Sequence, residues 1–201
     1  LSIYVNPTQF NNESDFNNYP ITLEEDLQKA HALGIDVVLL PSYSEIYPDK
    51  FRYKVSESDF SFSLCGANRP GHFDGVLTVV LKLLNIVKPL RAYFGEKDFQ
   101  QLALIKGMVK AFFIPTEVIA CPTVRQTDGL ALSSRNKRLS EAQLKKSTLI
   151  NKDLRSAGSS IEAQRKLEEQ GFKVDYVVDY QDRRYAAVYV GEVRLIDNVA
   201  I

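Results

Sequence analysis

Short apolar runs alternate with segments of helical period along the first 120 residues, and this order constrains the fold more than any other feature. Each run is three to five residues long and precedes a segment whose apolar residues share one helix face. Such an order predicts a parallel sheet in which helices connect one strand to the next. The expected strands are residues 2–5, 36–40, 92–94 and 117–120, and the expected helices are residues 22–34, 75–87 and 98–112.

Polar patterns mark where some of these elements begin and end. Thr22 and Glu25 are spaced as a capping box, and Gly34 follows the last apolar position of the same helix. Ser140 and Gln143 repeat the capping pattern before a helix that is expected to run to about residue 154. Residues 11–18 and 41–72 show no regular period, so we expect loops there.

The pattern changes near residue 138, which indicates a second, smaller domain. Residues 156–160 (SAGSS) have the composition of a flexible linker. A helix is expected over residues 161–170, followed by three β-rich runs that favour an antiparallel sheet, residues 174–179, 185–190 and 193–196. We therefore predict an α/β chain with a parallel-sheet domain over residues 1–138 and a small α+β domain over residues 139–201.

Composition excludes several classes of protein. Lys and Arg total 25 and Asp and Glu total 25, and zero net charge argues against a protein whose partner is the nucleic-acid backbone. No stretch reaches the ~18–20 apolar residues of a membrane span. Cys65 and Cys121 form no CxxC motif, and His31 and His72 have no clustered ligands, so no zinc site is expected. We expect a protein of a reducing, cytoplasmic compartment, with neither nucleic acid nor membrane as its partner.

Two candidate binding segments follow expected strands. Asn6 and Gln9 come directly after the first strand, at the sheet edge where α/β proteins hold ligands, although an Asn-Pro turn is the plainer interpretation. Lys97 stands between a strand that ends at Gly95 and the start of a helix, where free N–H groups favour phosphate. Ordinary helix capping by Asp98 is the alternative there.

Two loops add further candidates. Ser133, Ser134 and Arg135 place two hydroxyls beside a guanidinium, which suits a polyphosphate, although a surface turn explains the pattern equally well. Arg69 and His72 lie in a glycine-containing loop ahead of a helix. Arg69 is placed to meet an anion or an acidic side chain, whereas a lone histidine is more often structural.

Four of these segments together resemble one enzyme family. In chain order they read IYVNPTQF, RPGHFDGV, FGEKDFQQLALI and DGLALSSRN. Their order and spacing closely resemble the pantothenate synthetases, or pantoate–β-alanine ligases, over residues 2 to about 139. The run RLIDN at residues 194–198 is similar to the closing segment of that family.

The resemblance implies a fold and a reaction. The implied fold is a Rossmann-like parallel-sheet domain of the nucleotidyltransferase superfamily with a small C-terminal domain, in a homodimer. The implied reaction is the ATP-dependent joining of pantoate to β-alanine through pantoyl adenylate, with release of pyrophosphate and AMP. Mg²⁺ is the implied metal, because it neutralises phosphate charge.

The resemblance also implies roles for individual residues. The implied catalytic groups are Lys97, Ser133, Ser134 and Arg135. The implied pantoate and β-alanine contacts are Asn6, Gln9, Arg69 and Gln101. The implied ATP contacts are Gly95, Glu96, Lys97, Asp98, Val124, Leu132, Ser133, Ser134 and Arg135. Asp26 is expected near Mg²⁺, although the helix dipole also explains an acidic residue in a first turn.

The chain departs from the family pattern at one motif. The resemblance implies a histidine-containing HxGH motif ahead of the strand at residues 2–5, and these 201 residues contain none. We expect that an N-terminal strand and helix, and some C-terminal residues, are missing. Two alternatives stay open: another nucleotidyltransferase-type enzyme that activates a different acid, and a non-catalytic paralogue that only binds ligand.

Overall fold

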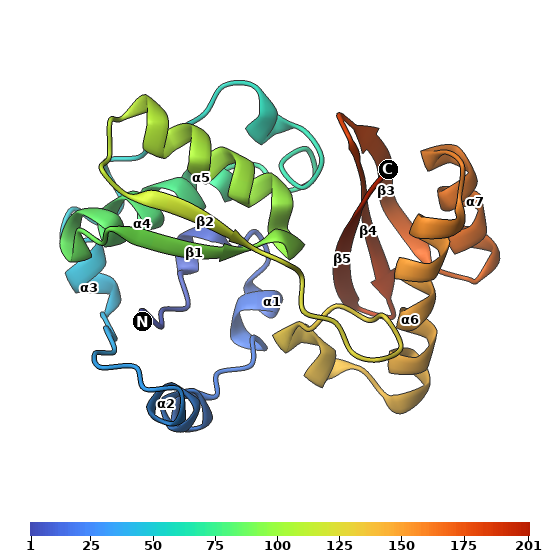
Figure 1. The fold of residues 1–201 in the computed structure, drawn as a ribbon, viewed down its shortest axis with the longest axis horizontal. Coiled ribbons are helices and arrows are strands. Elements are labelled where there is room, and N and C mark those ends of the chain that lie inside the picture. The colour runs from blue at the N-terminus through green and yellow to red at the C-terminus, as the bar shows by residue number, and fades with distance from the viewer.

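A computed structural model describes residues 1–201 and divides their strands between two sheets. Strands β1 (Arg91–Gly95) and β2 (Glu117–Cys121) pair in parallel. Strands β3 (Lys173–Tyr180), β4 (Arg183–Val190) and β5 (Val193–Ala200) form an antiparallel meander. The two sheets lie in separate halves of the molecule (Figure 1), which confirms the predicted α/β class.

Two long helices pack against the parallel sheet. Helix α4 (His72–Val87) begins three residues before the expected start, because Gly71 supplies the left-handed conformation (φ 76°) that precedes it. Helix α5 (Phe99–Ala111) follows a short 3₁₀ turn, η3 (Glu96–Asp98). Their apolar faces meet in one core with strand residues Ala92, Phe94 and Val118 at its edge.

The segments expected to be strands at residues 2–5 and 36–40 are not strands over those lengths. They meet in one parallel bridge, Ser2 to Leu39, with Ile3 N donating to Leu39 O at 3.0 Å. No further strand lies against this pair, and Val37 remains 72% exposed. An apolar run therefore predicted the extended conformation here but not its burial.

The chain between residue 6 and residue 70 contains more helix than its pattern predicts. Helix α1 (Glu13–Asn17) lies within the expected polar loop, and helix α3 (Tyr43–Ile46) has a complete capping box between Ser42 and Glu45. Short 3₁₀ turns occupy Pro7–Gln9 (η1) and Phe60–Phe62 (η2). These elements are too short to show a 3.6-residue period in sequence.

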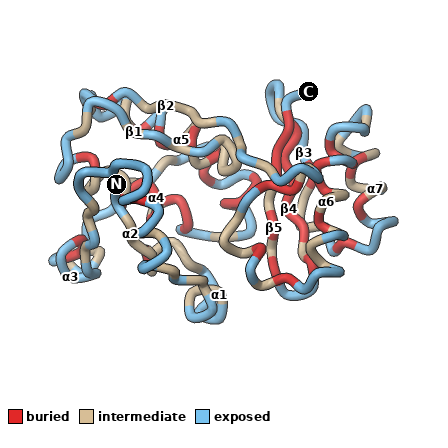
Figure 2. Tube along the Cα trace, turned by 60° about the horizontal axis from the view of Figure 1, so that its bottom comes forward, coloured by how far each residue is buried: buried red, intermediate tan, exposed pale blue.

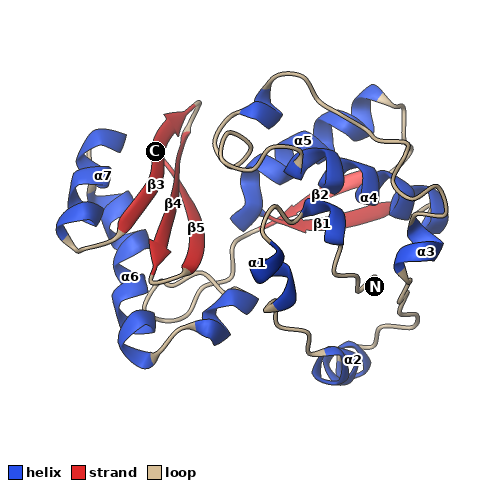
Figure 3. Ribbon diagram, turned by 180° about the vertical axis from the view of Figure 1, so that it is seen from behind, coloured by secondary structure: helices blue, strands red, loops and turns tan.

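Helix α2 (Leu23–Ala32) forms where it was expected, but its predicted capping box is wrong. The Thr22 side chain makes no capping bond and instead donates to Asp26 Oδ2 at 3.4 Å. Figure 3 shows α2 standing apart from the rest of the molecule on two extended connections. Ala30 is its only buried residue, so the apolar face of this helix is largely unpacked.

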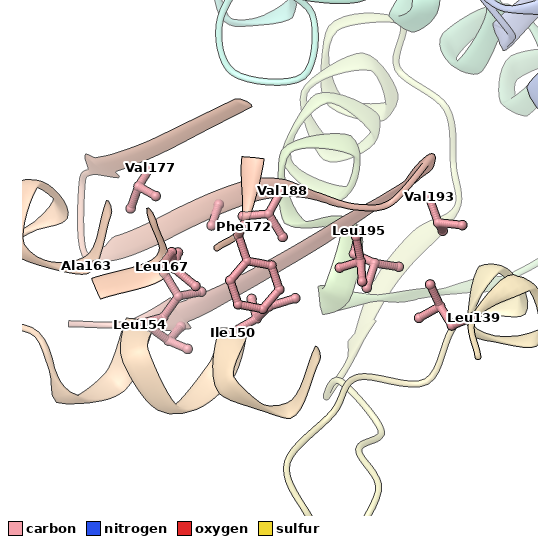
Figure 4. Close-up of a cluster of buried hydrophobic side chains, with 13 residues drawn as sticks. Leu139, Ile150, Leu154, Ala163, Leu167, Phe172, Val177, Val188, Val193 and Leu195 are labelled. Carbon is pink, nitrogen blue, oxygen red and sulfur yellow. The ribbon is translucent and has the colours of Figure 1, made fainter. Parts of the chain in front are cut away.

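Helices α6 (Glu141–Ser156) and α7 (Ser160–Glu169) cover one face of the antiparallel sheet. The predicted capping box of Ser140 and Gln143 is confirmed. Thirteen buried apolar residues form the core between helices and sheet, with Leu154, Leu167 and Val188 fully enclosed. Figure 4 shows Phe172 and Ile150 among them.

Residues 156–160 are a structured turn rather than a flexible linker. The buried Arg184 side chain donates to the carbonyl oxygens of Leu154 and Ala157 at 3.0 and 2.6 Å, and Ser159 caps α7 by accepting from Glu162 N. Fixed carbonyl groups and a capped helix leave this segment little conformational freedom. Composition alone could not reveal a partner that lies 27 residues further along the chain.

An extended connection carries the chain from β2 into the C-terminal half and ends in the 3₁₀ helix η4 (Ser134–Arg138). The proposed boundary between residues 138 and 139 stays a prediction. Arg138 pairs with Asp15 of α1, whereas Leu139 packs in the core of the antiparallel half. Figure 2 shows buried residues concentrated along β4 and β5, whereas only Val177 of β3 is buried. None of the helices has the length and apolar character needed to cross a membrane.

Candidate active site

A cavity of about 350 Å³ lies where the N-terminal half meets the connection to the C-terminal half. It is lined by η1, by the start of α5 and by the beginning of η4. Ten of the residues singled out from sequence lie on its wall: Asn6, Gln9, Arg69, Lys97, Asp98, Gln101, Leu132, Ser133, Ser134 and Arg135. Segments more than 120 residues apart in the chain therefore share one cavity.

Asn6 is a buried anchor of this cavity, with its amide fully used by the protein. Its Nδ2 donates to Gln9 Oε1 and to the carbonyl oxygen of Gly75, both at 3.2 Å. Its Oδ1 accepts from Thr8 Oγ1 at 3.0 Å and from Tyr47 Oη at 2.9 Å. An amide has two donors and two acceptor positions, so no group of Asn6 remains free and its contact holds the Gln9 amide in orientation.

His72 ties the cavity wall together as a neutral side chain. Burial lowers the pKa of His72 to about 3, and the neighbouring positive charge of Arg69 adds to the effect. Its Nδ1 lies 2.8 Å from the carbonyl oxygen of Gln9, which fixes the proton on Nδ1. Its Nε2 then accepts from Arg69 Nη1 at 3.2 Å, and Arg69 Nη2 donates to the same Gln9 carbonyl at 3.0 Å.

Lys97 and Gln101 lie on the same wall of the cavity, Lys97 in η3 and Gln101 in α5. Lys97 is the last but one residue of η3, and its ammonium lies 3.9 Å from Asp98 Oδ2. Asp98 stands at the N-cap position of α5 but makes no side-chain capping bond. Its carboxylate is therefore not used by the helix, which removes the capping alternative for this residue.

Ser134 and Arg135 are held by the segment around α1. Ser134 Oγ donates to Tyr19 Oη at 3.0 Å, and Arg135 Nη2 donates to Asp15 Oδ2 at 2.7 Å. Arg138 donates to the second oxygen of the same carboxylate at 2.8 Å. Burial alone would raise the pKa of Asp15, but the hydrogen bonds and charges of the two arginines outweigh it and lower that pKa.

Four predicted site residues lie outside this cavity. Val124 is 66% exposed and meets the site only through its carbonyl oxygen, which accepts from Leu132 N at 2.9 Å. Gly95 has ordinary extended geometry, and a Cβ there would meet nothing within 4 Å, so no protein contact requires glycine. The Glu96 side chain turns toward Arg183 of β4 at 3.6 Å. Asp26 lines a neighbouring cavity that shares Ser134 with this one.

Three aromatic residues of the wall, Tyr4, Phe10 and Tyr19, are not among the sequence candidates. The Phe10 ring packs edge-on against Tyr19 at 5.5 Å, and the Arg135 guanidinium lies 5.3 Å from the Tyr19 ring centre. Burial and two nearby tyrosines raise the pKa of Tyr4 to about 12. Aromatic residues in an otherwise polar run were the available signal for Phe10 and Tyr19.

The charged groups of the wall suit an anion. Arg69, Lys97 and Arg135 face Asp98 as the single carboxylate among the lining residues. Phosphate and carboxylate groups gain from such a cluster even in a protein of zero net charge. No group of three or more His, Cys, Asp or Glu residues is arranged to hold a metal ion.

Comparison with known proteins identifies the family of the chain. The family model for pantoate-beta-alanine ligase matches residues 1–200. The chain is 55% identical to a pantothenate synthetase of Bdellovibrio bacteriovorus over 201 residues, which is 100% of this chain and 80% of that protein. It is 52% identical to a pantothenate synthetase of Coxiella burnetii, over 99% of this chain and 77% of the relative.

Solved structures give the same result. A pantoate-beta-alanine ligase of Francisella tularensis, crystallised with beta-gamma ATP and beta-alanine, superposes with a TM-score of 0.93 at 46% identity. The match covers 99% of this chain and 77% of that one. A pantothenate synthetase of Thermus thermophilus superposes with a TM-score of 0.90 at 40% identity, over 99% and 82% of the two chains. The chain therefore belongs to the pantoate-β-alanine ligase family.

Proposed function

We propose that the cavity between η1, α5 and η4 is the site at which this ligase joins pantoate to β-alanine with ATP. One observation carries the proposal: the four motif segments of the sequence converge on a single cavity. That cavity combines amide groups, which suit hydroxyl and carboxylate oxygens, with three cationic side chains, which suit phosphate.

In the first step a pantoate carboxylate oxygen attacks the α-phosphorus of ATP. The bond from the α-phosphorus to the bridging oxygen breaks, and pyrophosphate leaves with that electron pair. We assign Lys97, Arg135 and the Ser133 and Ser134 hydroxyls to the charge that develops on the phosphate oxygens. Gln9 and Gln101 hold pantoate, with the Gln9 amide oriented by Asn6.

In the second step the β-alanine amine attacks the carbonyl carbon of the adenylate. The carbon–oxygen bond to phosphate breaks, AMP leaves with that electron pair, and the proton lost by the nitrogen passes to solvent water. We assign Arg69 to the β-alanine and pantoate end of the cavity, because His72 and the Gln9 carbonyl hold its guanidinium there. We assign the aromatic side chains Tyr4, Phe10 and Tyr19 of the wall to shielding the reactive anhydride from water.

Mg²⁺ fits this site as a companion of ATP rather than as an ion held by the protein. One carboxylate, Asp98, lines the cavity, and Asp26 lies in the cavity beside it. That donor set suits an ion that takes most of its ligands from phosphates and water. When bound, Mg²⁺ neutralises phosphate charge; Asp98 and, more weakly, Asp26 are the residues that we assign to its surroundings.

We also propose a homodimer in the cytoplasm. Leu90 and Phe113 are 87% and 91% exposed, and both lie just ahead of the paired strands β1 and β2. Exposed apolar side chains at the end of the sheet where β1 and β2 begin support a subunit interface there. The use of ATP and two unpaired cysteines support a reducing, cytoplasmic setting.

The test is the formation of AMP from ATP, pantoate and β-alanine by the full-length protein, together with pantoate-dependent exchange of pyrophosphate into ATP. We expect both activities, and we expect Lys97→Ala to lower them strongly while the circular-dichroism spectrum stays unchanged. Exchange that runs equally well with other 2-hydroxy acids would contradict the assignment of pantoate. Unchanged exchange in Lys97→Ala would contradict the role of that lysine.

A further inference from the structure

We propose that Asn198, on β5 of the C-terminal half, is a positioning residue for Lys97 across the boundary between the two halves. The proposal rests on the proposed role of Lys97 in the ATP site. It extends that role to a residue that lies 101 positions away in sequence.

The contact between the two residues is direct and unusual in its geometry. Asn198 Nδ2 donates to the carbonyl oxygen of Glu96 and to that of Lys97, both at 2.9 Å. Asn198 itself is buried, with 4% of its surface exposed. One side-chain amide thus holds two consecutive carbonyl groups of the turn that carries the lysine.

Apart from its neighbours in the chain, this turn has one other tie to the C-terminal half, the Glu96–Arg183 pair at 3.6 Å. Glu96–Asp98 form the short 3₁₀ helix η3 between β1 and α5, and Asp98 adds no side-chain capping bond. Short 3₁₀ segments have poorer hydrogen-bond geometry than α-helices. The two N–H groups of the Asn198 amide therefore hold the backbone of Lys97 in place. The position of this backbone sets the point from which the lysine side chain extends.

Asn198 is itself held firmly. Its Oδ1 accepts from Arg183 Nη1, and its backbone N–H donates to Asp197 Oδ1 at 2.8 Å. The Arg183 guanidinium lies 3.9 Å from the ring centre of Phe99, the first residue of α5. The donors of Asn198 are thus fixed relative to both halves of the molecule.

A second set of bonds keeps β5 against the N-terminal half. Arg125, on the connection after β2, makes two 2.7 Å bonds to the carboxylate oxygens of Asp197. Arg125 Nη2 also lies 3.4 Å from the Asn198 carbonyl oxygen. A shift of the C-terminal half would therefore move the Asn198 amide and the Lys97 backbone together.

A near-isosteric substitution distinguishes a role of Asn198 in positioning Lys97 from a role in merely holding the two halves together. Asn198→Asp keeps the acceptor for Arg183 but puts an oxygen where Nδ2 faced two carbonyl oxygens. We expect pantoate-dependent pyrophosphate exchange to fall about tenfold in kcat/KM for ATP, because a misplaced supporting group loosens the residue it holds. The KM for β-alanine is expected to stay unchanged.

Two comparisons make the result decisive. Leu167→Ala weakens the same half through its core, far from η3, and should lower the melting temperature without changing kcat/KM for ATP. Asn198→Asp combined with Lys97→Ala should be no slower than Lys97→Ala alone, because Asn198 acts through Lys97. If Asn198→Asp does not fold, Asn198→Ala removes the donor without adding charge and is measured in its place.

The outcomes distinguish the two proposals. If Lys97→Ala slows exchange but the Asn198 variant does not, the positioning role is wrong and the function of Lys97 stands. If the Asn198 substitution slows the Lys97→Ala protein by the same factor as it slows the unsubstituted protein, Asn198 acts independently of Lys97 and the proposal is overturned. If Lys97→Ala exchanges normally, the role of the lysine itself fails.

Discussion

The four hydrogen-bonding positions of the Asn6 amide are all filled within the protein, so its proposed role in the site acts through the Gln9 side chain that it orients. His72 acts in the same indirect way, because its two ring nitrogens hold the Gln9 carbonyl and the Arg69 guanidinium. Sequence could name these residues, since they follow strand ends and a glycine loop. It could not show which groups of each remain free, because the partners Tyr47 and Gly75 lie 41 and 69 residues away.

Because the pKa of His72 is lowered in the folded protein, the protein should become less stable as the pH falls. That pKa is lowered from 6.5 to about 3 in the folded state, so below pH 6.5 the unfolded chain binds a proton that the folded chain does not. The free energy of unfolding should fall as pH falls through this range, by at most about 1.4 kcal/mol per pH unit from this residue. Urea unfolding between pH 5 and pH 7 measures this dependence of the free energy of unfolding on pH. The dependence should be weaker in His72→Gln, and an equal dependence in both proteins would contradict the assignment to His72.

Among the elements, the contact of α4 with η1 sets the position of the cavity wall that carries Gln9. A Cβ on Gly75 would lie 2.5 Å from the Thr8 carbonyl oxygen and 2.9 Å from Gln9 N. Only glycine allows the helix to approach the turn this closely. Gly75 is therefore required for its lack of a side chain, whereas a Cβ on Gly95 would meet nothing within 4 Å.

Gly75→Ala should separate α4 from η1 and displace Gln9. We expect a loss of about 1–3 kcal/mol in the free energy of unfolding, as for overpacking of a tight contact, and a higher KM for pantoate. Gly107→Ala in α5 is the matched control, since a Cβ there meets nothing within 4 Å. That variant should be stabilised by up to about 1 kcal/mol through helix propensity. Equal effects of the two changes would argue against the close approach as the cause.

The elements that sequence predicted well are those long enough to show a period. Helices α4, α5, α6 and α7 and all five strands lie close to their expected positions. The errors have physical causes: α1 and α3 are single turns, and the runs at residues 2–5 and 36–40 lack a neighbour that would complete a sheet. Periodicity reports which residues favour burial, but tertiary contacts decide whether they are buried.

At the scale of the whole molecule, a largely buried ion pair joins the connection after β2 to β5. The Arg125 and Asp197 side chains are 17% and 5% exposed and are joined by two hydrogen bonds. Asn151 adds a bond to Asp197 Oδ2 at 3.2 Å, so the carboxylate also belongs to the core of the C-terminal half. No sequence pattern marks this pair, because its members are 72 residues apart.

Asp197→Ala should lower the free energy of unfolding by about 3 kcal/mol, because it leaves the Arg125 charge poorly solvated and without a partner. We expect the calorimetric transition to broaden or divide as the two halves lose their coupling. Glu117→Ala is the control: its pair with Arg91 is more than 60% exposed on both sides and should change stability by less than about 1 kcal/mol. A similar small change in both variants would contradict the structural role of Asp197.

The two sheets also differ in how far apart along the chain their partners lie, and this bears on the order of folding. Strands β3, β4 and β5 are joined by tight turns at Tyr180–Arg183 and Val190–Val193, so their contacts are local. Pairing of β1 with β2 joins residues 26 positions apart, across the whole of α5. Local contacts close smaller loops and form faster. The antiparallel meander is therefore expected to fold first and to present Asp197 and Asn198 as a finished surface, against which the slower parallel half then completes η3.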